Sequence, residues 1–271
     1  MQTFSIVTVC FNDAEALAPT IRSVVGQTFS DFQYVIQDGG STDDTAGLVK
    51  SFGDWIDVFT SEPDGGIYPA MNRAVQQCTG AYTLFINAAD MLAGPDVLAE
   101  LAGQLVEGDD IVTGQSIAVE TGKPHPFRAP DMFWGGMTFD HQAAVVRTEL
   151  LKQYPYDETL RISADFDFFC RMRRLGASFR SIPLAICRKP YTTGASASFI
   201  VRFRERYGVA IRNFGSAYPV EETLTRELVQ HMVKYFDAAH LEAHMKTLKV
   251  DALLKLHDEL ESLTAARQKR A

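Results

Sequence analysis

The sequence predicts an α/β fold with a Rossmann-like, mostly parallel sheet that is flanked by helices and followed by a helical C-terminal extension. Short apolar runs rich in β-branched residues alternate with segments of helical period through the first hundred residues, as in parallel sheets. After Pro219 the chain consists of helix-forming residues without Gly or Pro. With 271 residues, 46% of them hydrophobic, the chain can form one substantial core with a smaller appendage.

Four runs of the first half are predicted to be strands buried on both faces, because they are apolar almost without interruption. They are Phe4 to Cys10, Tyr34 to Gln37, Ile56 to Thr60 and Tyr82 to Asn87. The helices between them call for right-handed crossovers, which make the four strands parallel. Ligands are therefore expected at the carboxyl ends of these strands.

The helices between the strands carry recognisable signals. A first helix is expected to bury Leu17 and Ile21 on one side. A second is expected to begin at Thr42 behind the capping residue Ser41, and a third to stop near Gly80.

The second half shows a looser alternation of the same kinds of segment. Helices are expected near Pro95 to Val106 and from Ala164 to Leu175, and strands from Ile111 to Gln115 and from Phe139 to Val146. The proline-containing loop from Gly122 to Pro130 is interpreted as a mobile or an acceptor-facing segment, because variable loops build such surfaces.

The C-terminal extension has apolar residues at helical spacing. Leucines, a methionine and a phenylalanine recur every three or four positions: Leu224, Leu228, Met232, Phe236, Leu253, Leu256, Leu260 and Leu263. A stripe of this kind either packs on the preceding domain or pairs with a second copy, so a homo-oligomer through these helices is one expected arrangement.

Composition excludes several classes of protein. A formal net charge of −8 argues against a nucleic-acid-binding protein. The four cysteines, Cys10, Cys78, Cys170 and Cys187, are scattered without metal-ligand spacing and are expected to be buried free thiols. The sequence has neither a leader peptide nor a long apolar run, which predicts a cytoplasmic protein.

The predicted strand ends carry acids rather than a glycine cradle. Neither a dinucleotide-binding glycine pattern nor a phosphate loop follows the first strand. Asp38, Asp64 and Asp90 follow the next three strands, so they are expected on one rim of the sheet. Such carboxylates suit a divalent cation, Mn²⁺ or Mg²⁺, held together with substrate phosphates. The Asp38 carboxylate can also accept the ring N–H of a base, although its Asp-Gly-Gly-Ser-Thr run is equally consistent with a turn and helix cap.

Three motifs in order resemble the family-two inverting glycosyltransferases of the GT-A fold. They are the strand from Ser5 to Asn12, the run from Asp38 to Thr45, and Glu62 to Tyr68 with Ala70, Met71 and Asn72. The similarity spans about residues 1–215. It implies a nucleotide-sugar half at about 1–95, an acceptor half at about 96–215, and an extension at 216–271.

The resemblance also implies roles for individual residues. Thr8 and Asn12 would flank the nucleoside, Asp38 would contact its base, and Asp64 and Arg73 would lie near the base or the diphosphate.

The resemblance further makes Asp90 the metal-binding acid. Ala89 stands where many members of the family have a second acid, so Asp90 is left as the one clear metal carboxylate. His141 lies in a segment that the family places near the sugar and acceptor, and a polar residue satisfied at a strand edge is the competing interpretation.

Asp165 matches the position of the family's catalytic base, and Asp167 is a second acid on the acceptor side that can also serve structure. In an inverting reaction one carboxylate takes the proton of the acceptor hydroxyl as its oxygen attacks the sugar, so no covalent intermediate forms. Both acids would also suit the start of a helix because of its dipole.

The expected substrates are a nucleoside-diphosphate sugar, with UDP favoured, and a glycan or lipid-linked acceptor of polysaccharide biosynthesis. A degenerate GT-A domain that binds nucleotide or a partner without catalysis is the alternative, and Ala89 is the feature that favours it. The basic end from Arg267 to Arg270 is compatible with a peripheral contact with the inner face of a membrane.

Overall fold

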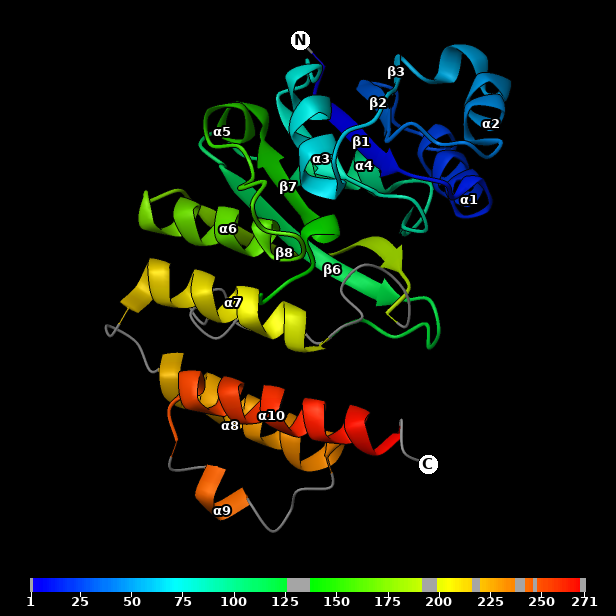
Figure 1. Ribbon diagram of the computed structural model, residues 1–271. Coiled ribbons are helices and arrows are strands. Elements are labelled where there is room, and N and C mark those ends of the chain that lie inside the picture. Colours follow the sequence, from blue (N-terminus) through cyan, green and yellow to red (C-terminus); the bar gives the residue numbers. More distant parts are fainter. Residues whose placement is uncertain are drawn as a thin grey trace.

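The computed structural model describes residues 2–125, 137–191, 199–215, 220–236, 242–245 and 248–268. Its centre is an eight-stranded sheet in the order β3-β2-β1-β4-β7-β6-β8-β5 (Figure 1). The first half of the chain supplies four parallel neighbours, which confirms the predicted parallel order. These strands are β1 (Phe4–Cys10), β2 (Phe32–Asp38), β3 (Val58–Ser61) and β4 (Tyr82–Phe85).

The second half of the sheet is mixed. It contains β5 (Met91–Leu92), β6 (Ile111–Ala118), β7 (Ala144–Arg147) and β8 (Phe179–Lys189). β7 runs antiparallel to both β4 and β6, β5 runs antiparallel to β8, and β6 and β8 are parallel. β7 therefore joins the two halves into one continuous sheet.

Helices cover both faces of the sheet. They are α1 (Ala14–Val25), α2 (Thr45–Ser51), α3 (Ile67–Gln76), α4 (Val97–Gln104), α5 (Thr148–Gln153), α6 (Ala164–Arg174) and α7 (Phe199–Phe214), with a 3₁₀ turn η1 at Gly53–Trp55. Phe4 and Ile6 of β1 join the core beneath α1 and α4, whereas Val7 and Val9 join the core beneath α3 and α6. Burial on both faces explains why β1 is apolar almost throughout.

Three local expectations are wrong, and each has a physical reason. α2 begins at Thr45, because the Ser41 hydroxyl donates to the Asp38 carboxylate instead of capping a helix. β7 begins at Ala144, because residues 141–143 form the 3₁₀ turn η3 (His141–Ala143). Gly80 does not end α3, which stops at Gln76, but lies against β1. A Cβ atom at Gly80 would be 2.3 Å from the carbonyl carbon of Phe4, which explains the glycine.

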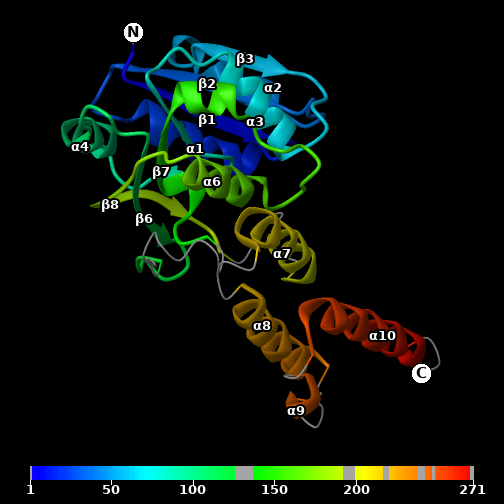
Figure 2. The ribbon, with the colours of Figure 1, turned by 90° about the vertical axis from the view of Figure 1, so that its left-hand side faces the viewer.

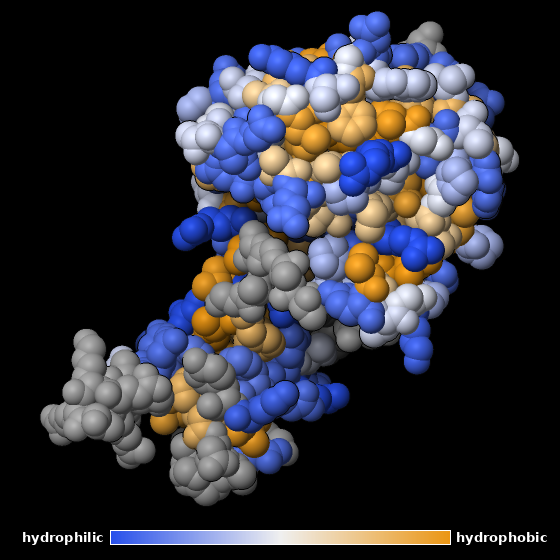
Figure 3. All heavy atoms as spheres, turned by 90° about the vertical axis from the view of Figure 1, so that its right-hand side faces the viewer, coloured by the Kyte–Doolittle hydropathy of each residue, from blue (hydrophilic) through white to orange (hydrophobic). Residues whose placement is uncertain are grey.

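The C-terminal extension forms α8 (Val220–Tyr235), α9 (Glu242–Met245) and α10 (Val250–Gln268), which project from the main body (Figures 1 and 2). α8 packs against α10 and α7, and the predicted stripe is buried at Leu224, Leu228, Met232 and Leu253. The side chain of Leu263 and residues 269–271 lie outside the described part. Figure 3 shows this narrower part beside the rounded main body, with hydrophobic atoms exposed on both. None of the helices in the described ranges has the length and hydropathy that a membrane-spanning segment requires.

The close approach at Gly80 is testable. Gly80→Ala is expected to lower the free energy of unfolding by about 1–3 kcal/mol, because the new methyl group would displace the β1 backbone. The matched control is Gly103→Ala in α4, where nothing lies within 4 Å of an added Cβ and the change should be stabilising by roughly 0.5–1 kcal/mol. Urea denaturation measures both, and equal effects at the two positions would contradict the packing argument.

Candidate functional site

A cavity of about 1230 Å³ opens at the carboxyl ends of the parallel strands, as predicted. One part is lined by the end of β1, the loop after β3 and the segment Asn87 to Asp90 after β4. The opposite part is lined by Met137 to Gln142, the start of α6, the end of β8 and α7. The cavity therefore spans both halves of the chain, with room for two substrates.

The Asp38 carboxylate lies behind the cavity wall and organises it. The side chain is fully buried and accepts hydrogen bonds from the Ser41 amide at 3.0 Å, the Ser61 hydroxyl at 2.6 Å and the Ser41 hydroxyl. Asp38 is not among the described residues that line the cavity. Its hydrogen bonds hold the loops after β2 and β3 together, which matches the turn-forming interpretation of this run.

Thr8 and Asn12 are likewise not among the described residues that line the cavity. The Thr8 hydroxyl donates to the carbonyl oxygen of Ile86 at 2.6 Å and is buried. Asn12 has a positive φ of 49°, and its side-chain oxygen accepts the Thr42 N–H at 2.8 Å. Both residues shape the strand-end loops, while Phe11 between β1 and Asn12 lines the cavity with 63% of its surface exposed.

Asp64 lines the cavity on a glycine turn. Its Oδ1 accepts the Gly66 N–H at 2.9 Å, and Gly65 and Gly66 have φ values of 89° and 134°, which favour glycine. Arg73 on α3 is 44% exposed and does not belong to the described lining. It pairs with Glu62 at 3.2 Å and donates to the carbonyl oxygen of Pro63 at 2.9 Å, so it braces the loop that carries Asp64.

Asp90 lies in the cavity wall, close to Gln142, whose amide donates to its Oδ2 at 3.0 Å. Burial raises the pKa of Asp90 to about 6, although the charges of Lys189 and His141 act in the opposite direction. Asn87 also lines the cavity, and its buried Oδ1 has no hydrogen-bond partner in the described part of the chain. These two oxygens are hard ligands of the type that Mg²⁺ or Mn²⁺ binds.

The structure brings His141 and Asp165 together, which the sequence treats as separate candidates. His141 Nδ1 lies 3.0 Å from Asp165 Oδ2, and both residues line the cavity with about the same small exposure. Asp165 Oδ1 accepts the Phe166 N–H at 2.8 Å and lies 3.1 Å from the Tyr68 hydroxyl. Burial alone would raise the pKa of Asp165, but the hydrogen bond and charge of His141 lower it below its usual range.

Two residues that the sequence analysis missed fix the loop in front of α6. The Tyr68 hydroxyl of α3 lies 2.6 Å from the Ile162 carbonyl oxygen. The carboxylate of Glu205, on α7, accepts the backbone N–H groups of Arg161, Ile162 and Ser163 at 2.8, 2.8 and 2.9 Å. Ser163, at the start of α6, makes no side-chain cap. Glu205, from another helix, therefore accepts backbone N–H groups at this end of α6, as a capping side chain would do. No sequence pattern signals a contact of this kind.

Asp167 is directed away from the cavity. Its side chain is 3% exposed and binds Arg171 Nε at 2.8 Å and Arg212 Nη2 at 2.7 Å. The second of these bonds links α6 to α7. The structure therefore places Asp167 in the helix interface, in keeping with its structural interpretation, and leaves Asp165 as the acid of this segment at the site.

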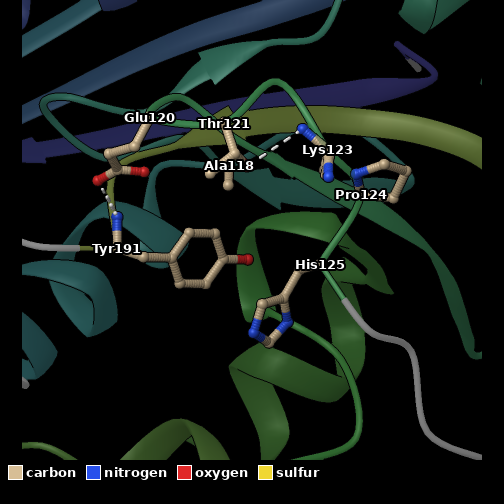
Figure 4. Close-up of a pocket in the computed structure, with 7 residues that line it drawn as sticks. All are labelled: Ala118, Glu120, Thr121, Lys123, Pro124, His125 and Tyr191. Carbon is tan, nitrogen blue, oxygen red and sulfur yellow. Dashed lines mark hydrogen bonds between the residues drawn. The ribbon is translucent and has the colours of Figure 1, made fainter.

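A smaller hollow of about 370 Å³ adjoins the main cavity and shares His125 and Tyr191 with it (Figure 4). The rings of these two residues are stacked, with their centroids 4.5 Å apart. Glu120 accepts the Tyr191 N–H at 2.8 Å, and the Tyr191 hydroxyl donates to Asp140. The rest of the predicted acceptor-facing loop, residues 126–130, lies outside the described part.

Comparisons with known proteins agree with this architecture. The sequence model of glycosyl transferase family 2 matches residues 5–177. A glycosyltransferase of PGL/p-HBAD biosynthesis from Mycobacterium bovis is 34% identical in an alignment of 185 residues that covers 62% of this chain and 68% of that protein.

Two solved structures show the same fold. Residues 1–349 of TarS from S. aureus in complex with UDP-GlcNAc give a TM-score of 0.65 at 19% identity, covering 85% of this chain and 72% of that one. The match spans 43% of the longer TarS chain. The mannosyltransferase PcManGT from Pyrobaculum calidifontis, in complex with GDP-Man and Mn²⁺, gives 0.62 at 18% identity and covers 97% of this chain and 81% of that one. The family model covers more than half of the chain, so the protein is a glycosyltransferase of the GT-A fold and belongs to glycosyl transferase family 2.

Proposed function

We propose that the protein transfers a sugar from a nucleoside-diphosphate sugar, with UDP favoured, to a hydroxyl of a glycan or lipid-linked acceptor, with inversion at the anomeric carbon. The observation that carries this proposal is the His141–Asp165 pair, which lies in a cavity lined from both halves of the chain. A partly buried carboxylate with a histidine partner at a two-substrate cavity has the chemistry of a general base.

The donor nucleotide would bind at the part of the cavity formed by the strand ends. Phe11 offers an exposed aromatic face on which a base can stack, and Asp64 offers a carboxylate for the base or ribose. Thr8, Asn12, Asp38 and Arg73 would support this part from behind. The binding of UDP-GlcNAc by TarS and of GDP-Man by PcManGT supports a nucleotide sugar as the donor.

A divalent cation, Mn²⁺ or Mg²⁺, would be held by Asp90 and by the donor diphosphate, with the Asn87 side-chain oxygen as a further ligand. When bound, it would neutralise the charge that develops on the leaving diphosphate. Asp90 is buried at the cavity and forms no salt bridge within the described part of the chain, which fits this role, and the Mn²⁺ complex of PcManGT supports it.

In the transfer step, Asp165 would accept the proton of the acceptor hydroxyl. The acceptor oxygen forms the new bond to the anomeric carbon while the bond from that carbon to the diphosphate oxygen breaks, and the electron pair leaves with the diphosphate. His141 would orient the carboxylate of Asp165 and hold its charge.

We further propose that residues 1–215 carry donor binding and transfer, and that residues 216–271 form the helical extension. The proposal also includes pairing of two copies through these helices and a peripheral contact with the inner face of a membrane. It assigns the protein a role in polysaccharide biosynthesis. Ala89, in place of a second acid, favours the alternative of a non-catalytic domain. That alternative does not explain why His141 and Asp165 are paired at the cavity. Incubation with a panel of nucleotide sugars and Mn²⁺ tests it, since a non-catalytic domain releases no nucleoside diphosphate.

Asp165→Asn is expected to lower kcat by roughly 10²- to 10⁴-fold while leaving UDP affinity nearly unchanged, because the carboxylate acts on the acceptor. Steady-state kinetics with the active donor and titration with UDP measure the two quantities. Glu149→Gln, an exposed carboxylate on α5, is the control and should behave as wild type. Retained transfer in Asp165→Asn would move the base to another residue.

Glu205→Gln is expected to lower kcat by about 10- to 100-fold with little change in the donor KM, because the loop before Asp165 loses part of its support. The matched control is Glu222→Gln on α8, which removes an exposed carboxylate paired with Arg226. A purely stabilising role for Glu205 would instead reduce the unfolding midpoint while kcat per folded molecule stays at the wild-type value.

Metal binding is expected to depend on the donor. Mn²⁺ should bind roughly 5- to 150-fold more tightly in the presence of UDP, and UDP affinity should rise by the same factor with Mn²⁺. Asp90→Asn should remove this coupling, whereas Asp54→Asn at an exposed position should keep it. Calorimetric titration measures both affinities, and tight Mn²⁺ binding without nucleotide would contradict a site built on Asp90 and the diphosphate.

A further inference from the structure

Two arginines of α7 line the cavity on the side away from the strand ends. Arg202 and Arg206 are one helical turn apart, so they project from the same face of α7. α7 packs on α6, and Figures 1 and 2 show α6 between α7 and the sheet half that ends in β1 to β3. The arginines therefore line the part of the cavity that the second half of the chain forms, as Asp165 does.

The positive charges of the two arginines lie close enough to act on each other. Burial, and then the charge of Arg206, lower the pKa of Arg202, while Glu227 acts in the opposite direction. Arg206 binds Glu227 through Nη2, and its side chain is only 17% exposed. Its Nε is buried and has no hydrogen-bond partner among the described residues. A buried guanidinium N–H without an acceptor is costly, so the Arg206 guanidinium has hydrogen-bonding capacity that its described neighbours do not use.

The same helix fixes the distance from this pair to the reaction centre. Glu205, which holds the loop before Asp165, lies between the two arginines in sequence. Any group bound by Arg202 and Arg206 would therefore be held in a defined position relative to Asp165. Arginine binds phosphate or carboxylate through two parallel N–H groups, which orients the bound molecule as well as attracting it.

We propose that Arg202 and Arg206 form an anion subsite that binds a phosphate group of the acceptor. This inference rests on the proposed function, because it takes the α7 side of the cavity as the acceptor side. The donor diphosphate also carries phosphate, but in the proposed function it binds beside Asp90, in the segment that follows β4. The acceptor is accordingly a phosphorylated glycan or a phosphate-linked lipid carrier, with the phosphate near the hydroxyl that is glycosylated.

The test is the binding of inorganic phosphate to the full chain saturated with UDP and Mg²⁺, measured by calorimetry at constant ionic strength. Phosphate should bind the wild-type complex, and Arg206→Gln should weaken it at least about tenfold, because charge-assisted hydrogen bonds are lost. The matched control is Arg204→Gln on the same helix, whose guanidinium pairs with Asp258 of α10 and does not line the cavity. This variant should bind phosphate as the wild type does.

Glu227→Gln separates the loss of the ion pair from the loss of the cation. It breaks the same contact with α8 but keeps the Arg206 guanidinium, so phosphate should bind at least as tightly as to the wild type. If Arg206→Gln does not fold, Arg202→Gln takes its place in the comparison.

Three results would overturn the subsite. Phosphate would fail to bind the UDP-saturated protein, or would bind the arginine variants unchanged, or the variants would lose affinity for UDP but not for uridine. The last result would assign the arginines to the donor diphosphate. None of these measurements needs turnover. Phosphate binding would therefore still test the subsite if the protein transferred no sugar.

Discussion

The carboxylate of Asp165 is held by groups from three separate elements, and the rest of the site depends on that contact. His141 comes from the turn before β7, Tyr68 from α3, and the Phe166 N–H from α6 itself. A buried carboxylate needs such partners because the charge is otherwise too costly to remove from water. The interaction therefore fixes where the helix that carries Asp165 meets the strand ends that form the other part of the cavity.

Two acids of the cavity, Asp90 and Asp165, have their pKa values moved in opposite directions by their surroundings. Burial raises the pKa of Asp90, whereas His141 and the hydrogen bonds around Asp165 outweigh burial and lower the pKa there. Burial outweighs the nearby charges of Lys189 and His141 at Asp90, which would suit a bound cation, whereas Asp165 is favoured in its ionised form. Under the proposed function, these two environments would separate a part of the cavity for the leaving group from a part for the acceptor.

The sequence was sufficient for those features that depend on local pattern. The four parallel strands, the acids at their ends and the apolar stripe of α8 follow from periodicity and from chain order. The motifs also identify the family. Local pattern does not distinguish a carboxylate that faces a ligand from one that organises a loop, so the buried hydrogen bonds of Asp38 became visible only in three dimensions.

Contacts between segments that are distant in the chain could not be predicted from the sequence. Glu205 binds backbone groups more than forty residues earlier, and backbone N–H groups carry no sequence signal. Ser41 was an ordinary helix cap by pattern, yet the nearby Asp38 carboxylate takes its hydroxyl, because a buried charge is the stronger acceptor. Competition of this kind depends on burial, which follows from the whole fold.

The central claim is direct displacement at the anomeric carbon with Asp165 as the base. The measurement that tests it most directly is the anomeric configuration of the product, determined by NMR from the coupling constant of the transferred sugar. With an α-linked nucleotide-sugar donor, the account predicts a β-linked product. An α-linked product would contradict direct displacement and require a different use of the cavity.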